Sequence, residues 1–147
     1  WEVDPFLDEW PQINAEFQLQ IPGVVELQNG WVLQVKEIED PLATLRGTFD
    51  NPDPYQAWME LSGEQNHLLI RGRVAGDVFK PLGMGGKKMK LSDFMVNVKI
   101  PRYARAGWPL ICVGDEIAWI PGFRLAHPFR LGRGGIGKVI HLRVYRR

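Results

Sequence analysis

The chain has 147 residues and a formal net charge of +1, which suits one domain or two small ones with a real hydrophobic core. No apolar run approaches the roughly 20 residues of a membrane helix, and no signal-peptide pattern is present, so we expect no membrane association. A single cysteine, Cys112, excludes an internal disulfide and fits a cytoplasmic protein. Because Cys112 lies in an apolar run, we expect a buried thiol rather than a nucleophile. The chain begins at Trp1 rather than Met, and we expect it to be part of a longer protein.

The near-neutral charge hides a split along the chain. Residues 1–70 hold two basic and thirteen acidic residues, a net charge of −11. Residues 71–147 hold sixteen basic and four acidic residues, a net charge of +12. We therefore expect an acidic β-rich sub-region over 1–70 and a basic sub-region over 71–147. The basic part favours a polyanionic partner, and the alternative is that the two parts neutralise each other across an internal interface.

The first predicted elements are β-strands, recognised by alternating apolar and polar residues and by turn residues at their ends. They cover residues 17–21, 24–27, 31–35, 57–61 and 67–73. Asn29-Gly30 predicts a hairpin turn, because both residues tolerate positive φ. Ser62-Gly63 predicts a second hairpin, and residues 40–54, rich in Asp, Asn and Pro, predict a loop.

A helix is predicted next, over residues 88–97. Leu91, Phe94, Met95 and Val98 recur at helical spacing and form one apolar face, which must dock on the sheet because so short a helix is marginal alone.

Glycines and lysines crowd the approach to this helix. A nucleotide-binding P-loop needs Ser or Thr after Gly-Lys, but Lys88 follows Gly86-Lys87, and Pro81 stands where the motif needs its first glycine. Lys87, Lys88 and Lys90 would lie at the helix N-terminus, where a cation is unfavourable unless an external anion is bound. The alternative is a set of solvated lysines on a loop.

A second short helix is predicted over residues 101–106, with Pro101 at its first position and Arg102 and Arg105 one turn apart. Residues 110–113 and 117–120 then predict a third hairpin, and residues 140–144 a last strand. Together these elements predict a β-rich α+β fold, with antiparallel hairpins or a sandwich and one or two short helices. The basic side chains predicted to contact nucleic-acid phosphates are Arg71, Arg73, Lys80, Lys87, Lys88, Lys90, Lys99, Arg102 and Arg105.

Catalytic and metal sites are not predicted. The three histidines, His67, His127 and His141, are far apart and show no metal-ligand spacing. Asp115-Glu116 lies in a turn, so a paired-carboxylate site is not expected. Trp108 and Trp119 are interpreted as core residues of the third hairpin.

The basic part contains a long pattern of spaced residues, strongest over 67–124. It comprises Arg71-Gly72-Arg73, Gly76-Asp77, Phe79, Pro81-Leu82-Gly83-Met84, Gly86, Lys88, Lys90, Phe94, Pro101, Arg105, Trp108-Pro109-Leu110 and Trp119-Ile120-Pro121-Gly122-Phe123-Arg124. In order and spacing, this pattern resembles the C-terminal region of tRNA(Ile)-lysidine synthetase. Val78 and Ala106 depart from it, at positions that are often basic and acidic respectively.

The resemblance implies a fold similar to the domain shared with the phenylalanyl-tRNA synthetase β subunit. It also implies a parent ligase that activates the wobble cytidine of isoleucine tRNA with ATP, and with Mg²⁺, before lysine displaces AMP. The activating motif, Ser-Gly-Gly-x-Asp-Ser, belongs to an N-terminal domain and is absent here, since Ser62 and Ser92 are the chain's two serines. The fragment is therefore expected to be inactive alone and to need no cofactor. Its implied partners are tRNA, mainly near the acceptor stem, and the missing catalytic domain.

One hypothesis from another class stays open. The chain could be a protein-contact or self-association module, for which salt-dependent tRNA binding is not expected.

Overall fold

The computed structural model describes residues 9–39, 53–132 and 137–147. Most of the loop predicted over 40–54 therefore lies outside the described residues.

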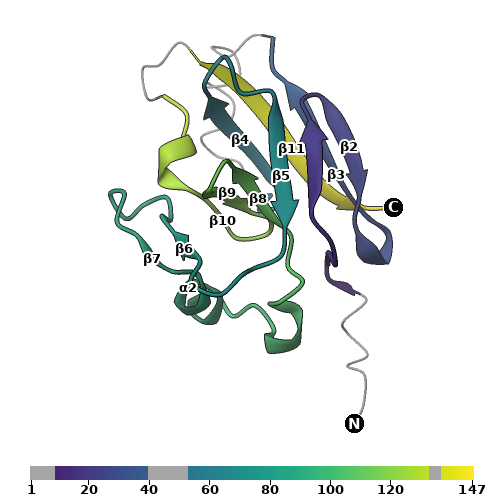
Figure 1. Cartoon of the computed structure of the whole chain (residues 1–147), viewed down its shortest axis with the longest axis vertical. Coiled ribbons are helices and arrows are strands. Elements are labelled where there is room, and N and C mark those ends of the chain that lie inside the picture. The colour runs from purple at the N-terminus through teal and green to yellow at the C-terminus, as the bar shows by residue number, and fades with distance from the viewer. Residues whose placement is uncertain (1–8, 40–52, 133–136) are drawn as a thin grey trace.

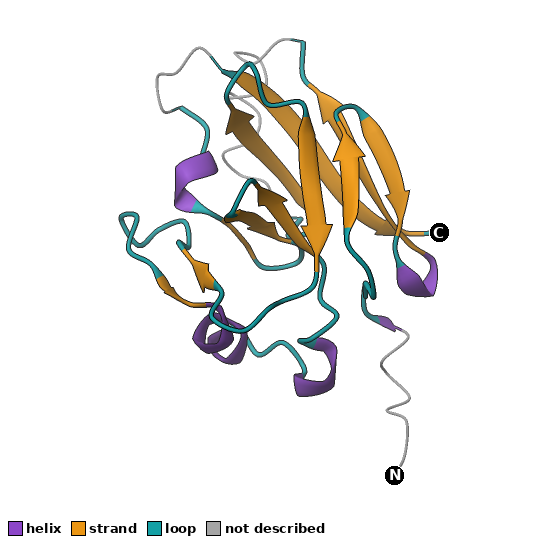
Figure 2. Ribbon diagram, in the orientation of Figure 1, coloured by secondary structure: helices purple, strands orange, loops and turns teal. Residues whose placement is uncertain are grey.

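Two antiparallel sheets form the body of the molecule (Figures 1 and 2). The five-stranded sheet has the order β1-β5-β8-β9-β10. Its strands are β1 (Phe17–Gln20), β5 (His67–Arg71), β8 (Leu110–Val113), β9 (Glu116–Ile120) and β10 (Arg124–Leu125). The four-stranded sheet has the order β2-β3-β11-β4. Its strands are β2 (Gly23–Glu26), β3 (Trp31–Glu37), β11 (Lys138–Arg146) and β4 (Gln56–Leu61).

One hydrophobic core joins the two sheets. Leu68 and Ile70 of the first sheet and Met59 and Leu142 of the second have no exposed surface and belong to the same cluster. The predicted β-rich α+β class is confirmed.

Two of the three predicted hairpins are confirmed. β2 and β3 pair across Asn29 and Gly30, whose φ angles are 63° and 80°. A short 3-10 helix, η2 (Gln28–Gly30), forms that turn. β8 and β9 pair as predicted, with a bulge between Ile111 and Cys112.

The predicted hairpin around Ser62-Gly63 is wrong. β4 pairs with β11 in the four-stranded sheet, whereas β5 lies between β1 and β8 in the other sheet. The segment between β4 and β5 thus carries the chain from one sheet to the other. Alternation of apolar residues reports which face of a strand is buried, but it carries no information about the strand's partner.

Strands from both sides of residue 70 lie in both sheets. β11, from the basic part of the chain, lies between β3 and β4 from the acidic part, and β1 pairs with β5. The division into 1–70 and 71–147 therefore describes the charge along the chain, and the sheets do not follow it.

Residues 72–107 leave the body after β5 and return at β8. They carry a two-stranded ribbon, β6 (Val78–Phe79) with β7 (Met89–Lys90), then α2 (Leu91–Asn97) and a 3-10 helix, η3 (Arg102–Ala104). This segment, called here the basic lobe, lies at the lower left of Figure 1.

The buried side chains of the lobe extend the hydrophobic core of the two sheets, since they belong to the same cluster. The predicted apolar helical face is confirmed, because Leu91, Phe94 and Met95 are at most 3% exposed. The rings of Phe79 and Phe94 pack edge to face, with 4.9 Å between their centroids. The predicted helix start at residue 88 is wrong, since residues 89 and 90 pair with β6 as a strand and α2 begins at Leu91.

Candidate nucleic-acid interface

The basic lobe concentrates positive charge. Its 36 residues hold eight basic and two acidic side chains, a net charge of +6. The eight are Arg73, Lys80, Lys87, Lys88, Lys90, Lys99, Arg102 and Arg105, and with Arg71 at its edge they make up the set predicted from the sequence.

Arg71 differs from the rest of this set, because its guanidinium is engaged within the fold. It donates two hydrogen bonds of 2.9 Å to the Asp77 carboxylate and one to the Gly72 carbonyl. The side chains of Arg71 and Asp77 are 12% and 10% exposed. Arg71 therefore shapes the start of the lobe, from the end of β5.

Asp77 ties that start to α2. Its carboxylate also accepts the Val74 N–H at 2.8 Å, and its carbonyl accepts the N–H of Leu91, the first residue of α2, at 2.9 Å. Burial alone would raise the pKa of Asp77, but the hydrogen bonds from Arg71 and Val74 and the Arg71 charge hold that pKa below its ordinary value. The same interaction has the opposite effect on its partner, because the hydrogen bond to Asp77 raises the pKa of Arg71.

Lys87 and Lys88 lie on the loop that joins β6 to β7, residues 80–88, called here the glycine–lysine loop. Both are exposed, and neither lies in the first turn of α2, so the predicted placement at a helix N-terminus is corrected. The loop curls through Gly83, Gly85 and Gly86, whose φ angles of 95°, 65° and 85° favour glycine.

Several contacts hold this loop against the segment that follows β9. The Leu82 N–H donates to the Leu125 carbonyl at 2.9 Å, and the His127 N–H donates to the Lys80 carbonyl at 2.8 Å. A Cβ on Gly86 would lie 3.2 Å from the His127 ring, so Gly86 packs closely on that imidazole. The loop is thus anchored at both its start and its end.

The other predicted residues surround this loop and α2. Lys90 is exposed and occupies the N-cap position of α2 without a capping hydrogen bond from its side chain, and Lys99 is exposed at a φ of 63°. Lys80 is half-exposed, with its Nζ 3.9 Å from a Glu116 carboxylate oxygen. Lys80, Lys88 and Glu116 line a small hollow of about 190 Å³ beside β6.

The three arginines of the basic lobe differ in how exposed they are. The predicted second helix is present as η3, with Pro101 at its cap rather than its first position, and it leaves Arg102 exposed. Arg105 donates from Nε to the Ile100 carbonyl at 2.9 Å, and an Arg73 nitrogen lies 4.0 Å from the Met95 sulfur. Arg73 and Arg102 are exposed, whereas Arg105 is half-buried.

Arg124 is a cation of this surface that the predicted set omitted. It is exposed, its guanidinium lies 6.0 Å from the centroid of the Phe94 ring, and it donates to the Leu82 carbonyl at 3.3 Å. It comes from β10, and no local spacing connects it with the lysines. The only feature of the sequence that pointed to Arg124 was its position at the end of the family pattern.

No catalytic or metal-binding residues were predicted from the sequence. No group of three or more His, Cys, Asp and Glu side chains that could hold a metal occurs among them. Burial raises the pKa of the Cys112 thiol to about 11, which suppresses the nucleophilic thiolate. Trp108 and Trp119 are core residues, as predicted, and the Trp108 indole donates to the Pro121 carbonyl.

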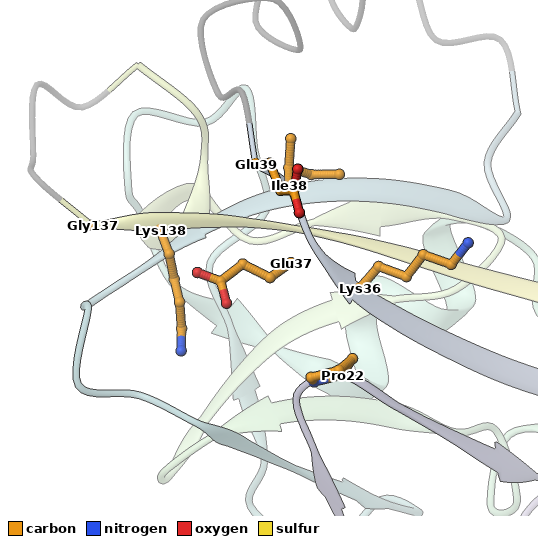
Figure 3. Close-up of a pocket in the computed structure, with 7 residues that line it drawn as sticks. All are labelled: Pro22, Lys36, Glu37, Ile38, Glu39, Gly137 and Lys138. Carbon is orange, nitrogen blue, oxygen red and sulfur yellow. The ribbon is translucent and has the colours of Figure 1, made fainter.

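A cavity of about 720 Å³ lies at the ends of β3 and β11 (Figure 3). It is lined by Pro22, Lys36, Glu37, Ile38, Glu39, Gly137 and Lys138. Its charges are mixed, and it contains none of the predicted site residues.

Across the described ranges, no helix is long and apolar enough to cross a membrane.

Known proteins match this chain over a region that includes the basic lobe. Residues 68–140 match the family model described as TilS substrate C-terminal domain. The chain is 30% identical over 120 residues to a tRNA(Ile)-lysidine synthase of Caldanaerobacter subterraneus subsp. tengcongensis, covering 78% of this chain and 24% of that protein. It is 32% identical over 125 residues to the tRNA(Ile)-lysidine synthase of Dehalococcoides mccartyi, covering 85% and 25%. The chain thus spans about a quarter of the length of these curated relatives.

A solved structure supports the fold independently. The crystal structure of a TILS C-terminal domain superposes with a TM-score of 0.68 over 90% of this chain and 98% of that one, at 23% sequence identity. The family match spans β5, the whole basic lobe and the β8–β9 hairpin, and the resemblance seen in the sequence is confirmed. The chain belongs to the TilS C-terminal domain family.

Proposed function

We propose that this chain is the tRNA-binding C-terminal module of a tRNA(Ile)-lysidine synthase. The observation that carries the proposal is the basic lobe, whose exposed cations gather on one projecting segment of a chain with almost no net charge. A protein that neutralises several phosphates gains most of its affinity from such a surface. The membership of the chain in the TilS C-terminal domain family supports tRNA as the polyanion.

The parent protein would carry the chemistry elsewhere. It would activate the wobble cytidine with ATP and Mg²⁺ and let free lysine displace AMP, in a catalytic domain that this chain does not include. The chain would serve it in the cytoplasm by holding isoleucine tRNA, with the catalytic domain as its second partner.

The arrangement of cations suits the backbone of duplex RNA on the acceptor-stem side. Lys87, Lys88 and Lys90 lie on and beside the anchored glycine–lysine loop, and Arg102 projects from η3. Phosphate contacts of this kind position an RNA without reading its bases, and A-form geometry is recognised by shape and backbone. Arg71 would act indirectly, by fixing the lobe through Asp77.

The test is the salt dependence of RNA binding by this chain. Fluorescence anisotropy would compare isoleucine tRNA, its acceptor minihelix and its anticodon stem-loop over a series of NaCl concentrations. We expect binding to the tRNA and the minihelix, with log affinity falling linearly with log salt. The absence of salt-dependent binding to any of the three would refute the proposal and favour a protein-contact module.

Two triple variants test whether the basic lobe is the surface that binds RNA. Lys87→Ala, Lys88→Ala and Lys90→Ala together should weaken binding and lower the log–log slope by about 0.7–0.9 for each phosphate that the variant no longer neutralises. The matched control removes three exposed cations of the four-stranded sheet and the chain end, Lys36, Arg143 and Arg147, and should change the slope little. Equal effects of the two triple variants would show that net charge matters and the lobe does not.

A further inference from the structure

Exposed apolar side chains gather on the same lobe as the cations. The described residues include seven large hydrophobic side chains that are at least 36% exposed. Six of them lie in the basic lobe, namely Val74, Val78, Leu82, Met84, Val96 and Tyr103, and the seventh is Val24 on β2. Exposed hydrophobic residues scattered singly need no explanation, but a cluster on one charged segment indicates a contact surface.

Leu82 and Met84 form the apolar tip of the glycine–lysine loop. Leu82 is 36% exposed and Met84 is 43% exposed. Gly83 and Gly85 flank Met84, and a Cβ added to either would meet nothing within 4 Å. The tip therefore presents two apolar side chains and bare peptide backbone to whatever approaches it.

Cations border this tip closely. The Lys87 N–H donates to the Met84 carbonyl at 3.2 Å, so one turn of chain joins the apolar tip to Lys87 and Lys88. Arg124 donates to the Leu82 carbonyl at 3.3 Å. An apolar tip bordered by cations complements a surface that is apolar in the middle and lined by anions.

The tip is also held in place. The loop is fixed to the body by the Leu82 to Leu125 and His127 to Lys80 hydrogen bonds and by the packing of Gly86 on His127. The fold thus keeps Leu82 and Met84 at the surface, although burying them would stabilise the chain. A preformed contact surface of this kind loses little conformational freedom on binding.

We propose that Leu82 and Met84 pack on ribose rings in the minor groove of A-form RNA, while Lys87, Lys88 and Arg124 contact the phosphates on either side. This groove is wide and shallow in RNA and displays sugars and 2′-hydroxyl groups, whereas in B-form DNA it is narrow. The bare backbone at Gly83 and Gly85 can approach the 2′-hydroxyls. The inference rests on the proposed function and adds to it the feature of RNA that the loop recognises.

The experiment uses the variant Leu82→Ala with Met84→Ala, and Val24→Ala as the matched exposed control. Each is titrated with an RNA duplex and a DNA duplex of the acceptor-stem sequence, over several salt concentrations. We expect RNA affinity to fall roughly tenfold, as removal of a small apolar contact does, with DNA affinity unchanged. The log–log salt slope should stay the same, because an apolar contact releases no counterions.

The outcomes separate the inference from the function on which it rests. Unchanged RNA affinity in the double variant, with the unaltered chain still binding RNA, would overturn the inference and leave the tRNA-binding proposal standing. An equal fall in affinity for RNA and DNA, or a lower salt slope, would overturn it as well. If sedimentation shows that the double variant loses self-association while keeping RNA affinity, the tip is a protein contact. Failure of the unaltered chain to bind RNA at any salt concentration would instead refute the proposed function.

Discussion

Replacing Asp77 by Asn should destabilise the chain by about 2–3 kcal/mol. The Asp77 carboxylate accepts three hydrogen bonds of 2.8–2.9 Å, two from Arg71 and one from the Val74 N–H. An amide keeps one acceptor oxygen, loses the charge and turns an NH₂ group toward these donors. Water can replace little of what is removed, because the two side chains are only 12% and 10% exposed.

A double-mutant cycle isolates the pair. Arg71→Met removes the guanidinium and keeps much of its apolar stem, and it should cost a similar amount because it leaves the carboxylate unpaired. The combined variant should cost less than the sum of the two, by roughly 1–2 kcal/mol. Urea unfolding followed by tryptophan fluorescence measures all three. Single variants that each cost less than about 0.5 kcal/mol, or that simply add, would refute the view that this pair holds the lobe on β5.

The stability that the Arg71–Asp77 pair contributes should decrease as the pH falls. Because the folded pKa of Asp77 lies below its ordinary value, its contribution is complete above the ordinary pKa, and is lost as the pH falls through the folded one. The stability difference between the unaltered chain and Asp77→Asn should therefore shrink as the pH falls through the acidic range below the ordinary carboxyl pKa of about 4. A gap that stays constant over this range would contradict the assignment.

Three further outcomes follow from the core and the chemistry. Phe94→Ala should destabilise the chain by about 3–5 kcal/mol and lower its melting temperature, because Phe94 is only 3% exposed and its ring packs on Phe79. An unchanged melting temperature would contradict the docking of α2. The Cys112 thiol should resist a disulfide reagent at neutral pH until urea unfolds the chain, since it is buried with its pKa raised to about 11, and rapid labelling of the folded chain would be inconsistent with that burial. The chain alone should form no lysidine from ATP, lysine and tRNA, as measured by nucleoside analysis, and detectable product would overturn the assignment of the chemistry to another domain.

Local signals predicted the elements whose geometry is decided within a few residues. The Asn29-Gly30 turn required positive φ at two successive positions, and the structure has both. The helical spacing of Leu91, Phe94 and Met95 identified the buried face of α2. These features depend on sterics and burial over one or two turns of chain, which a sequence records directly.

Long-range pairing could not be predicted in the same way. Nothing near residue 62 distinguishes a hairpin from a crossing between sheets, because β4 finds its partner in β11 almost eighty residues later. Arg124 reaches the glycine–lysine loop from β10, more than forty residues away in sequence. The apolar spacing that predicts α2 places its start near Lys88, because it does not show that residues 89 and 90 pair with β6.

The position of β11 has a consequence for synthesis. The ribosome releases β3 and β4 well before β11, yet these strands are neighbours of β11 and not of each other. Until β11 arrives, each keeps an unpaired edge, and such edges invite pairing with other chains. The four-stranded sheet therefore closes only once β11 is available, and folding of this kind, dominated by distant pairings, is slow. Deletion of residues 138–147 should consequently yield aggregates rather than a shortened but folded domain.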